Sequence, residues 1–153
     1  MNGPVICGIE DASDDGVAGV ARELADRYDL PLSFVHVLDG ADGADGADEA
    51  TRLLRETTAP GNGELAVVSG HPADSLVELA RAREASFLVL GNHGPRSSVL
   101  GSISADVSRR ASCPVVVVPP TAGVAQVEVV SSEPDVRGGI VRFGQAPDVR
   151  WVA

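Results

Sequence analysis

Five short apolar runs alternate along this chain with segments whose apolar residues recur at helical spacing, and this alternation constrains the fold most. The runs are Pro4–Ile9, Leu32–Leu38, Leu65–Val68, Phe87–Leu90 and Cys113–Pro120. Because they are nearly continuous in apolar residues, they are typical of parallel strands that helices cover on both sides. We therefore expect an α/β fold: an open, doubly wound five-stranded parallel sheet with helices on both faces.

The segments between the runs are expected to form four helices. Their predicted ranges are Asp14–Tyr28, Ala50–Thr58, Pro72 to about Glu84, and about Val99–Arg110. Ser13 is a candidate N-cap of the first helix, since a serine hydroxyl can accept a hydrogen bond from a free helical amide. In contrast, Gly40–Asp48 consists of three copies of Gly-Ala-Asp, and this glycine-rich acidic tract predicts a surface loop.

Composition limits the size and the partners of the fold. A chain of 153 residues is long enough for one core, and with only three Phe, one Tyr and one Trp that core must be aliphatic. The net charge is −10 and lysine is absent, so we expect no nucleic-acid partner. Absence of lysine also excludes a Walker A loop, whose lysine contacts the phosphates.

The two cysteines and the hydropathy favour a cytoplasmic location. Cys7 and Cys113 each adjoin an apolar run, which suits buried thiols better than a disulfide. No apolar stretch approaches the roughly 20 residues that span a bilayer, and no basic leader precedes the first run. We therefore expect no membrane association.

The last part of the sequence is expected to be an extension of the main domain. Residues 1–120 would form the α/β domain and residues 121–153 the extension. Gln126–Val129 and Ile140–Phe143 alternate in polarity around Gly138-Gly139, which predicts a β-hairpin. Such a hairpin could pair with the sheet edge beside the fifth strand or reach a second subunit, and the sequence does not decide between these.

Ligands of open α/β sheets bind beyond the carboxyl ends of the strands. The fourth strand leads into Gly91-Asn92-His93-Gly94, and Gly101-Ser102-Ile103-Ser104 follows at the start of a predicted helix. Backbone amides, hydroxyls and the positive end of a helix suit a phosphate group. The alternative is that these glycines only allow the chain to turn, because glycine turns follow many strands that bind no ligand.

Other chemistry has less support in the sequence. Glu10, Asp11 and Asp39 could together hold a divalent cation, or they could form a solvated acidic rim. The three histidines lack the spacing of zinc ligands, and no nucleophile is paired with a base, so we expect no metal site and no catalytic residue.

Taken together, these motifs resemble the universal stress protein family over about residues 4–119. The resemblance rests on the acid that ends the first run, on Val35-His36-Val37, on Gly70-His71-Pro72-Ala73, and on the two glycine motifs after the fourth run, with Cys113-Pro114 and the four valines behind them. It implies strand order 3-2-1-4-5, a role in stress response or signalling, and binding of ATP, with or without Mg²⁺ and with at most slow hydrolysis.

The resemblance also implies which residues bind the nucleotide. Glu10 and Val37 would flank the nucleoside, with Val37 against the adenine. Gly91 and Gly94 would shape the loop beside the ribose and phosphates. The phosphates would meet Gly101, Ser102 and Ser104.

Two positions differ from the family pattern. Six residues separate Gly94 from Gly101 where the pattern has nine, and Glu10 stands where the family usually has Asp. Arg96, within the shortened loop, is either a compensating phosphate contact or an exposed charge. An alternative function therefore stays open: a dimeric interaction module that has lost ATP binding.

Members of this family usually dimerise, which makes the fifth run a candidate interface. The alternative is that the C-terminal hairpin covers the same edge and leaves a monomer or a different dimer. The candidate residues for homodimer contact are Val115, Val116, Val117 and Val118.

Overall fold

The computed structural model describes residues 2–39, 44–59, 61–93 and 100–120. Its five parallel strands are β1 (Val5–Gly8), β2 (Leu32–Leu38), β3 (Glu64–Ser69), β4 (Phe87–Gly91) and β5 (Val115–Val118). The sheet has the order β3-β2-β1-β4-β5. This confirms the predicted doubly wound sheet and its strand order. The order reverses between β1 and β4, which creates a switch point there.

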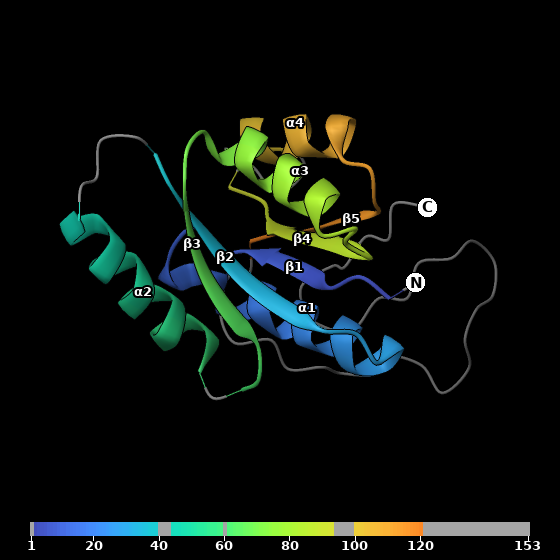
Figure 1. Ribbon diagram of the computed structural model, residues 1–153, viewed down its shortest axis with the longest axis horizontal. Helices are drawn as coiled ribbons and strands as arrows, with labels where there is room; N and C mark the ends of the chain where they lie inside the picture. The colour runs from blue at the N-terminus through green and yellow to red at the C-terminus, as the bar shows by residue number, and fades with distance from the viewer. Residues whose placement is uncertain (1, 40–43, 60, 94–99, 121–153) are drawn as a thin grey trace.

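Helices cover both faces of the sheet (Figure 1). They are α1 (Asp15–Tyr28), α2 (Ala44–Thr58), α3 (Pro72–Ala82) and α4 (Ser102–Arg110), with a short 3-10 turn, η1 (Ala12–Asp14), before α1. Alternate strand residues face the two layers. Cys7 and Phe34 pack in the layer with α1 and α2, whereas Ile6 and Val35 pack in the layer with α3 and α4.

The core is aliphatic, as the composition predicted. Among the described residues, the largest fully buried side chains include one aromatic ring, that of Phe34. Cys7 lies in this core without solvent exposure, and its thiol donates a hydrogen bond to the Val17 carbonyl at 3.9 Å. Burial raises the pKa of the Cys7 thiol well above its usual value. Cys113 is half-buried, and both cysteines are free thiols.

The start of α1 differs from the prediction. Asp11 is the N-cap of the 3-10 turn η1, where its carboxylate accepts the Ser13 amide at 2.8 Å, and Asp14 is the N-cap of α1, without a side-chain cap hydrogen bond. Asp14 completes a reciprocal capping box from the third position of the turn. The prediction that Ser13 caps α1 is wrong because the chain first forms the 3-10 turn, so that Ser13 lies inside η1 and α1 begins only at Asp15.

The loop predicted for Gly40–Asp48 is wrong from Ala44 onward, because α2 begins there. Alanine is the best helix former, and leucine, arginine and glutamate rank close behind it. These preferences outweigh the single glycine, Gly46, inside the helix. Residues 40–43 lie outside the described part of the chain.

The start of α4 is also corrected. The helix begins at Ser102 rather than Val99, and Gly101 is its N-cap with extended φ and ψ angles of −63° and 161°. Leu100 precedes this cap and is exposed. The predicted extension at 121–153, with its hairpin, lies outside the described residues.

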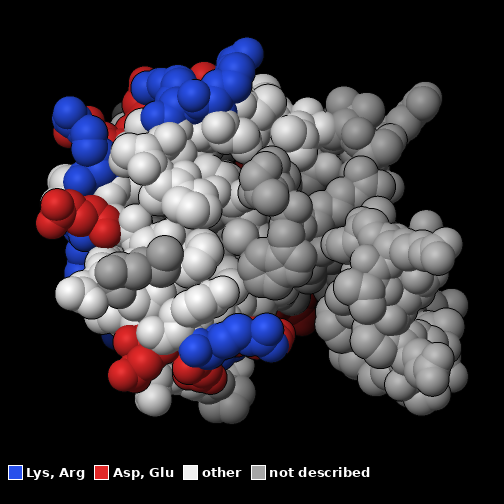
Figure 2. All heavy atoms as spheres, turned by 90° about the vertical axis from the view of Figure 1, so that its right-hand side faces the viewer, with Lys and Arg blue, Asp and Glu red and all other residues white. Residues whose placement is uncertain are grey.

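Most arginines of the described chain are paired with acids on its surface. Arg27, Arg81, Arg83, Arg109 and Arg110 each contact a carboxylate within 4 Å. On the face in Figure 2, basic and acidic side chains lie close together near the periphery, around a centre with few charges. Exposed pairs of this kind contribute little stability individually.

None of the described helices combines the length and the apolar character needed to cross a bilayer.

Candidate functional site

A cleft lies at the carboxyl ends of β1, β2 and β4. Its volume is about 400 Å³, which falls in the range of small-molecule sites. It therefore occupies the switch point of the sheet, where ligands of this architecture bind.

The cleft brings together six of the seven residues proposed from the sequence. These are Glu10, Val37, Gly91, Gly101, Ser102 and Ser104. They come from β2, β4, α4 and the segment after β1, so the fold assembles them from distant parts of the sequence. Gly94 and Arg96 lie outside the described residues.

One wall of the cleft is apolar. Val35 and Val37 reach it from β2 and Leu76 from α3, and Leu90 and Ile103 complete it. Val37 belongs to the partly buried side chains that pack against the core beneath α3 and α4. Such a wall suits the flat, weakly polar face of a heterocyclic base.

The amino end of α4 supplies backbone donors to the same cleft. The first amides of a helix have no acceptor within the helix, and within the described residues no side chain caps α4. The Gly101 amide is the exception in this segment, since it donates to Asn92 Oδ1 at 3.0 Å. The amides of Ser102, Ile103 and Ser104 are thus suited to receive an anion, aided by the helix dipole.

The hydroxyl of Ser104 has a different role from the one expected of it. It donates to the Gly91 carbonyl at 3.0 Å, and Ser104 is only 3% exposed. This bond attaches α4 to the end of β4. The hydroxyl proton is therefore used within the protein, which leaves the backbone amide as the donor that Ser104 offers to a ligand.

Asn92 is a structural residue that sequence reasoning missed. It is 5% exposed, its amide donates to the Val118 carbonyl at 2.7 Å, and its side chain accepts the Gly101 amide. One residue thus connects the end of β4 to β5 and to the cap of α4. A polar residue in a glycine turn gives no periodic signal, so the sequence did not reveal this function.

The other wall of the cleft is polar and acidic. Glu10, Asp39, His36 and His93 lie on it, and no arginine is among the described lining residues. His36 Nδ1 is 2.8 Å from the Ile9 carbonyl. Because a carbonyl oxygen only accepts, Nδ1 must carry the proton, which leaves Nε2 as an acceptor when the ring is neutral.

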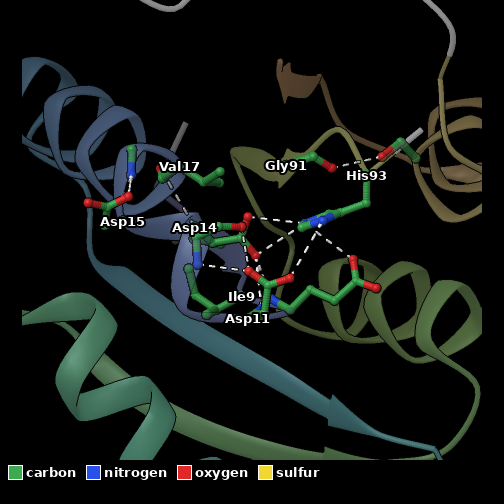
Figure 3. Close-up of polar contacts among 12 residues, drawn as sticks. Ile9, Asp11, Asp14, Asp15, Val17, Gly91 and His93 are labelled. Atoms are coloured by element: carbon green, nitrogen blue, oxygen red, sulfur yellow. Dashed lines mark hydrogen bonds and ion pairs between the residues drawn. The ribbon is translucent and has the colours of Figure 1, made fainter. Parts of the chain in front are cut away.

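A carboxylate cluster surrounds His93 beside this wall (Figure 3). Nε2 of His93 lies 3.1 Å from Asp14 Oδ1 and 3.3 Å from Glu10 Oε2, and Nδ1 lies 3.9 Å from Asp11 Oδ2. Asp14 is buried, whereas Glu10 and Asp11 are exposed. A hydrogen bond from the Ser13 hydroxyl is the main cause that lowers the pKa of Asp11 below its usual value.

The suggested cation site at Glu10, Asp11 and Asp39 is not assembled in the described structure. Glu10 and Asp39 line the cleft, but Asp11 does not; it faces Ser13 and His93 instead. Across the described ranges, no group of three or more His, Cys, Asp or Glu side chains has an arrangement that could hold a metal ion.

Comparison with known proteins agrees with this geometry. Residues 1–119 match the universal stress protein family. A solved universal stress protein from Archaeoglobus fulgidus has a TM-score of 0.67 and 22% identity over 76% of this chain and 98% of its own. A universal stress protein in complex with cAMP has a TM-score of 0.63 and 25% identity over 79% of this chain and 100% of its own.

A third structure, from Archaeoglobus fulgidus in complex with dAMP, has a TM-score of 0.63 and 21% identity over 76% of this chain and 98% of its own. No curated protein matches the sequence. The family match spans both the strands and the cleft, and the solved structures share the fold across nearly their whole lengths. The chain therefore belongs to the universal stress protein family.

Proposed function

We propose that this chain binds an adenine nucleotide in the cleft at the carboxyl ends of β1, β2 and β4. The observation that carries the proposal is that one cleft combines an apolar wall at Val37 with the uncapped amino end of α4. The first suits a base and the second a phosphate. The 25% identical universal stress protein in complex with cAMP supports the same ligand class.

The residues of the cleft fit the parts of a nucleotide. Val37 would contact the base, the Glu10 carboxylate would accept hydrogen bonds from ribose hydroxyls, and the amides of Ser102, Ile103 and Ser104 would donate to phosphate oxygens. Gly91 and Gly101 also line this space, where a backbone can approach a ligand closely.

ATP together with Mg²⁺ is the specific ligand that we propose. The described lining contains two carboxylates, Glu10 and Asp39, and no arginine. The end of a helix offers only about half an elementary charge. A divalent cation would offset the charge of a triphosphate beside these carboxylates, and carboxylate and phosphate oxygens are the ligands that Mg²⁺ prefers.

Titration calorimetry of nucleotide-free protein with Mg-ATP, AMP and cAMP tests the proposal. We expect saturable binding of at least one of them with micromolar or tighter affinity, and adenine nucleotide in the acid extract of freshly purified protein. If no nucleotide binds and none is extracted, nucleotide binding is rejected. The second candidate, a dimeric interaction module without a nucleotide, would then explain the shortened loop between Gly94 and Gly101.

We also propose that the protein forms a homodimer through β5, which is an edge strand of the described sheet. Val115 and Val117 on this strand are only partly buried, whereas Val116 and Val118 are buried. Val117→Arg should dissociate the dimer, because a charge would have to be desolvated at the paired edge. Sedimentation velocity would show halved mass; an unchanged dimer would place the interface elsewhere, and a monomeric wild type would reject dimerisation.

A further inference from the structure

The carboxylate of Asp14 connects the two chain segments that meet at the switch point. Its side chain is only 4% exposed. Its Oδ2 accepts the backbone amide of Glu10 at 2.7 Å and that of Asp11 at 3.3 Å. Hydrogen bonds to a charged acceptor are stronger than neutral ones. These bonds fix the backbone that carries the Glu10 side chain.

The same carboxylate also contacts the segment after β4. His93 Nε2 lies 3.1 Å from Oδ1 and 3.3 Å from Oδ2 of Asp14. Figure 3 shows the His93 ring directed toward Asp14 from the opposite side of the cluster. Glu10 and His93 both line the cleft, whereas Asp14 does not. Asp14 therefore contacts two residues of the cleft without reaching the ligand space itself.

The third residue beside the Asp14 carboxylate is Gly91, where any side chain would collide with it. A Cβ added at Gly91 would lie 2.6 Å from Asp14 Oδ1, much closer than carbon and oxygen approach without a bond. The φ angle of Gly91 is not among the positive values of the described chain, so its backbone does not itself demand glycine. Glycine at this position leaves room for the carboxylate.

From these contacts we propose that Asp14 is a positioning residue for nucleotide binding, acting through Glu10 and His93. The proposal rests on the nucleotide-binding function argued above. With the carboxylate in place, Glu10 and His93 are held at one wall of the cleft before a ligand arrives. Without its charge, the hydrogen bonds weaken, and ordering of both residues must accompany binding.

Asp14→Asn tests this role, with Asp15→Asn as the matched control. Both substitutions remove one negative charge, but Asp15 is exposed, and among the described residues its carboxylate accepts a hydrogen bond from the adjacent Gly16 amide alone. We expect Asp14→Asn to weaken binding of the tightest of ATP, AMP and cAMP about tenfold or more, as loss of hydrogen bonds to a charged group predicts. Asp15→Asn should change affinity less than twofold. Equal affinity of Asp14→Asn and wild type would overturn the proposal.

Nitrogen-15 NMR without nucleotide separates this proposal from the proposed function. In Asp14→Asn, the signals of the Glu10 amide and the His93 ring nitrogens should shift, and in Asp15→Asn they should not. If the wild type binds no nucleotide, the proposed function fails, and the positioning of Glu10 and His93 is judged by these signals alone. Unchanged signals would overturn it.

A measurement on the wild type covers the case in which Asp14→Asn does not fold. The Glu10 amide should exchange with solvent far more slowly than an unstructured amide, because it donates to a buried carboxylate. Exchange at the unstructured rate would show that the bond to Asp14 is not formed, and the proposal would be wrong.

Discussion

Gly91→Ala is expected to destabilise the protein by about 1–3 kcal/mol, the usual cost of forcing an extra methyl group into a packed site. The new Cβ would meet Asp14 Oδ1 at 2.6 Å, His93 Nε2 at 3.1 Å and Val17 Cγ2 at 3.2 Å. Asp14 cannot easily move aside, since two backbone amides hold its carboxylate. Urea unfolding followed by circular dichroism, without nucleotide, measures the effect.

Gly16→Ala is the matched control for this prediction. Gly16 lies in α1, and a Cβ there would have no atom within 4 Å. Since alanine is the better helix former, this change should stabilise the protein by up to about 1 kcal/mol. The two alanine substitutions are thus expected to have opposite signs.

A double substitution identifies the cause of the Gly91 effect. If the clash is with the Asp14 carboxylate, Gly91→Ala and Asp14→Ala together should cost less than the sum of their separate costs. Strict additivity would mean that another contact, such as Val17, causes the destabilisation. A Gly91→Ala protein as stable as the wild type would show that the carboxylate yields readily, contrary to its hydrogen bonds.

The sheet could be predicted from the sequence because its signals are local. A strand that is buried on both faces needs a nearly continuous apolar run, and such a run is visible in the sequence. The run Leu32–Leu38 has the same bounds as the observed β2. Helix boundaries were less predictable. The beginning of α2 at Ala44 has no apolar periodicity to mark it, and the caps at Asp11 and Gly101 depend on how the chain enters each helix.

The residues that line the cleft could be predicted from the sequence, but the hydrogen bonds that hold them in place could not. Glycines and hydroxyls near strand ends indicated Gly91, Gly101 and Ser102, and the fold brings these into one cleft. The bonds from Asn92 to Val118 and from Asp14 to His93 join residues that are far apart in sequence. Such pairings arise where segments after different strands meet in the fold, and they leave no local pattern in the sequence, so Asp14 and Asn92 were not expected to matter.

Gly101→Val is expected to abolish stabilisation by nucleotide while the protein still folds. At a nucleotide concentration of 100 times Kd, the wild type should gain about 2.7 kcal/mol of unfolding free energy, and the variant nearly none. Gly101 lines the cleft at the N-cap of α4, so a branched side chain there would occupy space beside the amides that a phosphate needs. Its φ of −63° and ψ of 161° accommodate valine, and the loss of a favourable N-cap costs about 1 kcal/mol.

Thermal unfolding with and without nucleotide measures this difference, and Gly19→Val provides the control. Gly19 is exposed on α1, with no atom within 4 Å of an added Cβ, so this variant should keep the full nucleotide-induced shift. Loss of the shift in Gly101→Val alone would locate the phosphates at the amino end of α4. Should Gly101→Val be stabilised as strongly as the wild type, the phosphates cannot depend on the amides of Ser102, Ile103 and Ser104, and this account of the cleft would have to be abandoned.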